Sequence, residues 1–185
     1  MIEDKERWNV RHVEKPMRKN VEPLVEKYID LATVGNALDI ACGTGRNTHF
    51  LAKKGFMVDA VDLSDYALSC IDEDKKINKI EVDLDEYTLT SKKYDLIINI
   101  NYLQRRFFPQ IKEALKEGGV VIFETFIVAH GDFNNPANPE YLLRKNELLH
   151  AFIGLDIVYY EEKDEVNLRG EKIRVASLVA QKPIC

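Results

Sequence analysis

Two glycines one residue apart are the feature of this sequence with the clearest chemical meaning. They lie in the segment "ALDIACGTGRNT" (residues 37–48), where Gly43 and Gly45 follow a short apolar run that ends at Ile40. Glycine tolerates positive φ and lets another group approach the backbone closely. The segment is therefore either a tight turn alone or a turn against which a ligand lies. The third glycine of a dinucleotide fingerprint is replaced by Thr48, and no Lys-Ser or Lys-Thr pair follows, which disfavours a pyrophosphate site and excludes a Walker-type loop.

Three aspartates lie where strands are expected to end. Asp39 precedes the glycine turn. Asp62 lies at the end of the strand expected in "MVDAVDLS", and Asp83 lies at the end of the strand expected in "KIEVDL". A carboxylate at Asp62 is suited to accept two strong hydrogen bonds from ribose hydroxyls, and one at Asp83 could accept from the exocyclic amine of adenine. A single aspartate of this kind is usually a turn or cap residue. Three of them on successive strands, together with one glycine turn, favour a nucleoside ligand.

The elements that must position these residues alternate between strands and helices. The patterns predict strands over 37–40, 57–63, 79–84, 94–100 and 120–126, and helices over 46–55, 64–74 and 108–119. Ser64 is the expected N-cap of the second of these helices. Such alternation predicts an α/β fold with a Rossmann-like, mostly parallel sheet and helices on both faces. Ligands of such sheets bind beyond the carboxyl ends of the strands, where the glycine turn lies.

The two ends of the chain complete the expected architecture. A helix is predicted within 20–32, after a polar N-terminal stretch. An Asn-, Pro- and Gly-rich loop of about 14 residues follows Phe126, and loops of that length tend to be functional lids or disordered. A helix is predicted over 144–154, and strands over 155–162 and 171–181 are separated by a connection short enough for an antiparallel hairpin. The expected sheet therefore has seven strands, with a C-terminal antiparallel hairpin strand.

Composition bounds the class of protein. A chain of 185 residues with 45% hydrophobic and 31% charged residues is about one compact globular domain. The net charge of −5 and the scattered basic residues argue against a nucleic-acid partner. No apolar run is long enough to span a membrane, and the charged start is unlike a signal peptide, so we expect no membrane partner. Three irregularly spaced cysteines without a CxxC pair favour reduced thiols in a cytoplasmic protein and no metal site.

The segment "ALDIACGTGRNTHFLAKKGFMVDAVDLS" resembles the S-adenosylmethionine-binding region of class I methyltransferases, and "KEALKEGGVVIFETF" resembles the helix, turn and fifth strand of that fold. The resemblance implies S-adenosylmethionine as cofactor, a methyltransferase domain over 37–185, and a helical segment over 1–36 that covers the cofactor. It implies that Asp39 orients the turn, that Asp62 holds the ribose and that Asp83 borders the adenine. The other cofactor-binding positions that it implies are Trp8, Ala41, Cys42, Gly43, Thr44, Gly45, Arg46, Asn47, Leu63, Leu84, Asn99, Asn101 and Tyr102.

Within that superfamily, the glycine segment and the tail "KNELLHAFIGLDIVYYEE…RVASLVAQKP" are most similar to small tellurite-resistance-type methyltransferases. In those enzymes a histidine and arginines between the last two strands are thought to address the oxyanion. This chain has Arg169 and Arg174 there but no histidine, a departure from that pattern.

Three residues are candidates for a catalytic role. Glu124, a carboxylate within "VVIFETF", is either an acid paired at the sheet edge or a group that binds the acceptor or accepts its proton. His130, in the long loop, is either an exposed loop residue or a base. Arg105, after the fourth strand, is either a solvated charge or a hook for an anion.

The function indicated by these residues is S-adenosylmethionine-dependent methyl transfer to a small molecule such as a thiol or a soft oxyanion like tellurite, with residues 127–143 as a gate. The alternative is a non-catalytic cofactor-binding module that serves as a sensor or as an assembly partner. A nicotinamide oxidoreductase is disfavoured by Thr48 and by the expected hairpin. The sequence gives no indication of oligomeric state.

Overall fold

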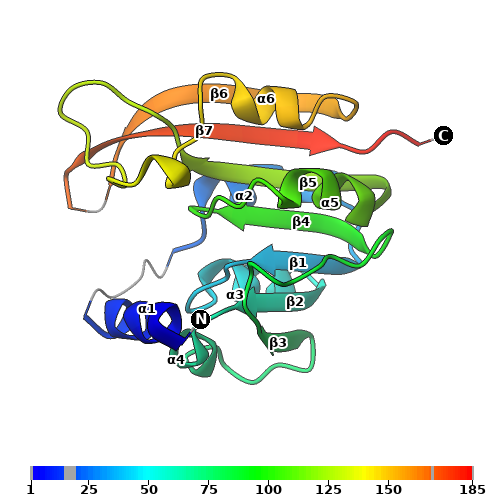
Figure 1. Ribbon diagram of the computed structural model, residues 1–185. Helices are drawn as coiled ribbons and strands as arrows, with labels where there is room; N and C mark the ends of the chain where they lie inside the picture. Colours follow the sequence, from blue (N-terminus) through cyan, green and yellow to red (C-terminus); the bar gives the residue numbers. More distant parts are fainter. Residues whose placement is uncertain (1, 15–19, 168, 185) are drawn as a thin grey trace.

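A single seven-stranded sheet organises the chain (Figure 1). The computed structural model describes residues 2–14, 20–167 and 169–184. The strand order is β3-β2-β1-β4-β5-β7-β6. The strands are β1 (Asn36–Ile40), β2 (Met57–Asp62), β3 (Ile77–Glu81), β4 (Tyr94–Ile100), β5 (Leu115–Phe126), β6 (Asp156–Val166) and β7 (Lys172–Gln181).

The pairing confirms the predicted architecture. Strands β1 to β5 pair in parallel, whereas β7 runs antiparallel to both of its neighbours, β5 and β6. Strand β4, "YDLIINI", has the bounds that were predicted from its apolar run. Such a continuous run is typical of a central strand that is covered on both faces. Strand order reverses between β1 and β4, which is where ligands of doubly wound sheets bind.

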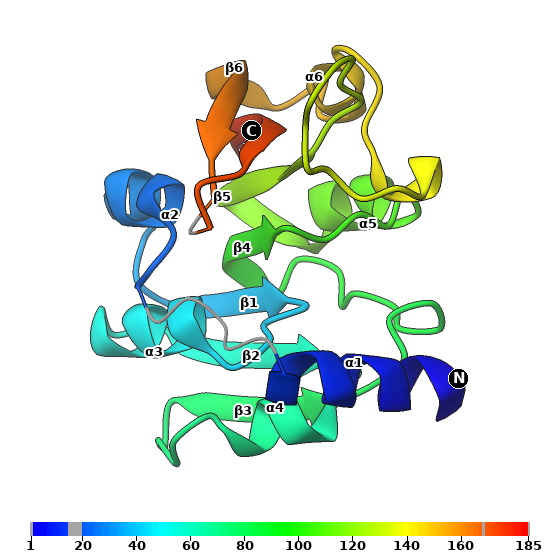
Figure 2. The ribbon, with the colours of Figure 1, turned by 90° about the vertical axis from the view of Figure 1, so that its left-hand side faces the viewer.

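Helices cover both faces of the sheet (Figure 2). One face packs against α2 (Pro23–Tyr28) and α3 (Arg46–Lys53), and the other against α5 (Phe107–Ala114) and α6 (Glu147–Ala151). The remaining helices are α1 (Ile2–Glu14), α4 (Asp65–Ser69) and the two 3₁₀ helices η1 (Ile29–Leu31) and η2 (Pro139–Tyr141). Figure 2 looks at the edge where the parallel strands end, and α1 lies across that edge near β2 and α4.

Three helical predictions need correction. The N-terminal polar stretch, which has no helical pattern of its own, forms α1, within the helical segment that the resemblance implied over 1–36. The helix predicted over 64–74 spans only Asp65–Ser69. The helix predicted over 108–119 ends at Ala114, because the chain joins β5 at Leu115, which pairs with Tyr94. The glycines expected to close the helix lie instead inside the strand, at a shift in the β4–β5 register that accommodates the positive φ of Gly118.

The third strand is also displaced from its predicted position. Strand β3 spans Ile77–Glu81 rather than 79–84. Asp83 therefore lies beyond the strand, in a turn where its carboxylate accepts the backbone N–H of Asp85 at 2.9 Å. This hydrogen bond lowers the pKa of Asp83. Asp83 therefore lies two residues beyond the end of β3, near the carboxyl edge of the sheet.

Candidate active site

The glycine turn connects β1 to α3 through an unusual run of backbone conformations. Ala41, Gly43 and Gly45 all have positive φ, and Gly45 is the N-cap of α3. A Cβ atom at Gly45 would lie 2.6 Å from Cγ1 of Ile71, so both the conformation and the packing require glycine there. The turn therefore exposes peptide groups at the N-terminus of an eight-residue helix, where partial positive charge favours a carboxylate or phosphate.

Asp62, at the end of β2, holds this turn in place. One carboxylate oxygen accepts the N–H of Gly43 at 2.8 Å, and the other accepts the N–H of Ser64 at 2.9 Å. The side chain is buried, yet each oxygen keeps a lone pair for a further donor. Asp62 can thus fix the turn and still accept hydroxyl donors from a ribose.

Asp39 lies beneath the turn, in β1, and is almost completely buried. Its carboxylate accepts the hydroxyl of Thr48 at 2.7 Å. Burial raises the pKa of Asp39 to about 7, against the opposing effect of the Thr48 hydrogen bond. A cationic ammonium bound nearby would favour the ionised form of this carboxyl, so Asp39 fits the role expected for the amino group of methionine.

Arg46 and Asn47 connect α3 to the start of α2. Arg46 forms a buried ion pair with Glu22 at 2.8 Å, and the Asn47 side-chain oxygen accepts the N–H of Glu22 at 2.9 Å. These contacts orient the first turn of α3 through protein groups. Direct contact of either side chain with a cofactor stays a prediction.

The end of β4 forms the next part of the same edge. The Asn99 amide donates to the Tyr102 carbonyl at 2.7 Å, and Asn101, at positive φ, donates its N–H to the Glu124 carbonyl at 2.8 Å. Burial raises the pKa of Tyr102 above its usual range. Leu84 is buried beside this region in the main core, whereas Thr44 and Leu63 are half-buried. The expected cofactor residues therefore gather at the carboxyl ends of β1, β2 and β4.

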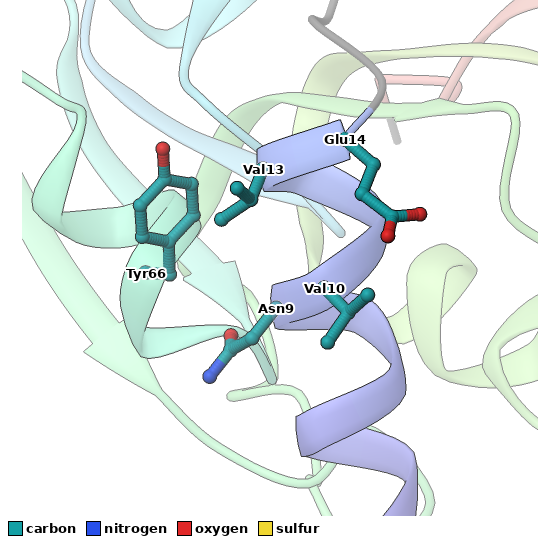
Figure 3. A pocket seen from close by; sticks show the side chains of 5 residues that line it. All are labelled: Asn9, Val10, Val13, Glu14 and Tyr66. Carbon is teal, nitrogen blue, oxygen red and sulfur yellow. The ribbon is translucent and has the colours of Figure 1, made fainter.

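Helix α1 reaches this edge through polar contacts with α4. Asn9 accepts the Ser64 hydroxyl at 2.5 Å and donates to Asp65 at 2.7 Å. Lys5 pairs with Asp65 at 2.9 Å and with Glu81 at 2.5 Å. Figure 3 shows Asn9 and Val13 on α1 facing α4, where they line an open cavity of about 320 Å³ with Tyr66. The helix therefore lies over the β2 end of the edge, and its role as a cofactor cover stays a prediction.

His12 of α1 has a buried polar atom that the protein leaves unsatisfied. The side chain is 9% exposed, and its Nδ1 has no hydrogen-bond partner among the described residues. Burial lowers the pKa of His12, although the nearby Asp62 carboxylate opposes that effect. Buried polar groups normally have a partner. An unsatisfied nitrogen close to Asp62 fits a ligand with hydroxyl groups, and so the residues present fit a nucleoside cofactor.

Trp8 lies one helical turn before His12, and their ring centroids are 6.1 Å apart. The ring is half-buried beneath the Arg11 guanidinium, whose Cζ lies 4.9 Å from the ring centroid. A contact between Trp8 and the cofactor stays a prediction.

Glu124 is buried in β5, on the face of the sheet that packs against α2. Its carboxylate accepts the Ser177 hydroxyl at 2.5 Å and lies 3.7 Å from the Lys163 ammonium. Burial raises the pKa of Glu124 to about 7, so the group exchanges a proton near neutral pH. Glu124 is therefore paired with a hydroxyl of β7 and an ammonium of β6.

Arg105 is fully engaged with the long loop and α6. Its guanidinium bonds both carboxylate oxygens of Glu147, at 2.5 and 3.0 Å, and donates to the carbonyls of Glu140 and Leu142 at 3.0 and 2.8 Å. Arg105 thus clamps the segment that follows β5. Binding an anion, as predicted from sequence, would require it to release Glu147.

His130 is exposed and lines an open cavity of about 490 Å³ with Arg144, Lys145, Glu162 and Arg174. Ile127 and Arg174 place this cavity on the α5–α6 face of the sheet, opposite the face that carries Glu124. The three catalytic candidates, Glu124, His130 and Arg105, therefore do not form a single site in the structure. The cluster of cations in this cavity was missed in the sequence because its members come from two segments, 144–145 and 174, that are about 30 residues apart.

The described residues contain neither a cluster of metal ligands nor a membrane-spanning helix. Among them, no three histidine, cysteine, aspartate or glutamate side chains are grouped to hold a metal ion. None of the helices described is both long and apolar enough to cross a membrane.

Comparison with known proteins points to one family. The family model for the tellurite resistance protein TehB matches residues 10–175. A TehB of Haemophilus influenzae, described as a probable S-adenosyl-L-methionine-dependent methyltransferase, is 25% identical over 161 residues, covering 78% of this chain and 56% of that protein. The chain spans about half the length of the curated relatives it matches, between 40% and 56%.

Solved structures agree with this assignment. The crystal structure of TehB from Haemophilus influenzae matches with a TM-score of 0.78 at 19% identity, covering 95% of this chain and 67% of that one. A phosphoethanolamine N-methyltransferase from Haemonchus contortus, solved with S-adenosyl-L-methionine, matches with a TM-score of 0.65 at 16% identity over 87% of this chain and 51% of that one. These likenesses confirm the methyltransferase fold. Since the family match covers most of the sequence, the chain belongs to the family of the tellurite resistance protein TehB.

Proposed function

We propose that this chain binds S-adenosylmethionine at the glycine turn and transfers its methyl group to a small-molecule acceptor. One observation carries the proposal: in a chain of this family, Asp62 accepts the N–H of Gly43 in the turn and that of Ser64, while an unsatisfied His12 nitrogen lies buried close by. Buried polar groups normally have a hydrogen-bond partner, and a ligand bound beside Asp62 would supply one for the His12 nitrogen of α1.

In this proposal each residue of the chain has a positional task. Asp62 and the N–H groups of the turn hold the ribose and methionine portions, and Asp39 holds the amino group. Asp83 and Leu84 border the adenine, while Asn99, Asn101 and Tyr102 face the reacting side. When bound, the cofactor supplies a methyl group on a sulfonium; the acceptor's lone pair forms the new bond and the carbon–sulfur pair returns to sulfur. The protein mainly positions the acceptor and excludes water.

The need for a base depends on the acceptor. A thiolate or a soft oxyanion has a free lone pair, whereas an alcohol or an amine must lose a proton. Glu124 is the candidate for receiving that proton, since it is buried and its pKa is raised to about 7. His130 and Arg105 stay weaker candidates, because the first is exposed and the second is held by Glu147.

Calorimetry on the purified chain tests the cofactor assignment. We expect micromolar binding of S-adenosylmethionine and of S-adenosylhomocysteine, weakened by Asp62→Ala. The matched control is Asp72→Ala, because the Asp72 side chain is 95% exposed. Binding of NADH without either sulfur compound would refute the proposal.

Methyl transfer itself is tested with radiolabelled S-adenosylmethionine and a panel of thiols, tellurite, selenite, amines and carboxylates. Transfer to any of them that is lost in Asp62→Ala supports an enzyme. Tight cofactor binding without transfer to the panel or to any component of a cell extract would favour the alternative, a non-catalytic sensor or assembly partner.

A further inference from the structure

We propose that the cavity between the β5–α6 segment and the β6–β7 hairpin binds the anionic group of an organic acceptor. This inference rests on the proposed methyltransferase function and names the class of molecule that the enzyme would modify: a small organic acid that carries a carboxylate or phosphate apart from its nucleophile.

The charge of the lining supports an anionic ligand. Three fixed cations, Arg144, Lys145 and Arg174, line the cavity together with one carboxylate, Glu162. Glu162 already accepts the N–H of Asn146 at 2.6 Å and the Tyr160 hydroxyl at 2.7 Å. The cavity therefore has net positive charge in a chain whose net charge is −5.

The cations differ in how far they are already neutralised. Arg174 pairs with Asp164 at 2.7 Å. By contrast, the side chains of Arg144 and Lys145 make no hydrogen bond or ion pair with other described residues. These two exposed side chains are the ones available to a new carboxylate or phosphate. The planar guanidinium of Arg144 suits either group, because both present paired oxygens.

The size and the apolar part of the cavity favour an organic ligand over an inorganic oxyanion. A volume of about 490 Å³ falls within the range of small-molecule sites, which is about 300–1,000 Å³. Ile127 and Phe133 contribute apolar surface to the lining, and the Lys172 ammonium lies 4.3 Å from the Phe133 ring centroid. An oxyanion alone would leave most of this space and its apolar wall unused.

The walls are held by hydrogen bonds, so the cavity is largely formed before a ligand arrives. The Asn135 side chain donates to the carbonyls of Ile127 and Arg174, at 2.7 and 2.9 Å, and accepts the N–H of Arg174 at 3.0 Å. The N–H of Val128 donates to the Leu143 carbonyl at 2.9 Å. The loop is therefore attached to β7 and to the start of α6.

The position of the cavity suits the reach of such a substrate. It lies at the carboxyl end of β5 and beside β7, which are the first and second neighbours of β4 on that side of the sheet. Ile100 at the end of β4 pairs with Glu124, and Ile127 lies three residues further along, so one strand spacing of about 4.8 Å and about 10 Å of extended chain separate the cavity from the β4 end where the reacting side is proposed. A small organic acid spans that distance.

Nuclear magnetic resonance titrations of the full chain, with and without S-adenosylhomocysteine, test the proposal. The probes are benzoate, phenyl phosphate, the neutral benzamide, and tellurite. We expect benzoate or phenyl phosphate to shift the amide signals of residues 127–133 and 144–146, and the stronger of the two identifies the anionic group. The double variant Arg144→Gln/Lys145→Gln should weaken this binding by about tenfold.

The matched control is Lys53→Gln/Lys75→Gln, which removes the same charge from two exposed side chains on other elements. Equal binding of benzamide and benzoate, equal weakening in both double variants, or shifts with tellurite alone would overturn the proposal. If the original chain does not bind S-adenosylhomocysteine, the proposed function is refuted. The anion site is still tested in that case, because the anion titration is also run without S-adenosylhomocysteine.

Discussion

Replacing Glu124 by glutamine should remove a pH dependence that this buried acid gives to the unfolding free energy. Burial raises the pKa of Glu124 from an ordinary 4.5 to about 7 in the folded chain. The folded state therefore holds the proton more tightly than the unfolded state does. The stability that this proton contributes is fully present below pH 4.5 and is lost as the pH rises through about 7.

The magnitude follows from the size of the shift. A difference of roughly 2.5 pKa units corresponds to about 3 kcal/mol, of which about 2–3 kcal/mol should be lost between pH 5 and pH 8.5. Glutamine keeps an acceptor for the Ser177 hydroxyl and cannot ionise. Glu124→Gln should therefore match the original chain near pH 5 and exceed its stability by this amount at pH 8.5.

Urea denaturation at pH 5, 6, 7 and 8.5 measures the effect. Asp39, whose pKa is also raised to about 7, is present in both chains, so its contribution cancels in the difference. The matched control is Glu117→Gln, an exposed acid on the same strand, which should change stability by only a few tenths of a kcal/mol at every pH. A constant difference between Glu124→Gln and the original chain across this range would refute the assigned protonation of Glu124.

Three further predictions concern the cofactor edge. Gly45→Ala should lower the unfolding free energy by about 2 kcal/mol or more, because φ is +81° and the new Cβ would lie 2.6 Å from Ile71; melting temperature measures this, and a double-mutant cycle with Ile71→Ala, which has its own cost in the buried core, separates the clash from the backbone strain. Asp62→Ala should lower it by about 2–3 kcal/mol, since two buried backbone N–H groups lose a charged acceptor; unchanged urea midpoints would contradict the described turn. Asn9→Ala removes two contacts of α1 and should shift the fluorescence of Trp8, the single tryptophan of the chain, toward longer wavelength; an unchanged spectrum would show that these contacts do not position α1.

Local sequence signals were sufficient for much of the fold. The apolar run of β4, the glycine turn and the Ser64 cap each depend on neighbouring residues, and each lies where it was predicted. The antiparallel hairpin was predicted because a short connection between two strands permits no parallel crossover.

The remaining features depend on partners far apart in the sequence. Helix α1 has few apolar residues at helical spacing, and its docking depends on contacts between Asn9 and residues of α4. Strand β5 begins at Leu115 because it pairs with Tyr94, and this pairing overrides the local helical pattern. The partner of Arg105 is Glu147, 42 residues away, so its clamp role had no local signal. The candidate cofactor residues were predicted as a group because they follow the strand ends.

The polar docking of α1 also determines how a ligand could enter and leave. Val10 and Val13 remain 54% and 59% exposed, so these apolar side chains of α1 contribute little buried area to its attachment. The ion pairs and hydrogen bonds that Lys5 and Asn9 make with α4 and β3 are exposed to solvent, and each such contact stabilises the attachment only weakly. A helix attached by individually weak contacts can detach while the rest of the fold persists. Ligand exchange can then proceed through a minor population with α1 open, while the seven-stranded sheet stays intact.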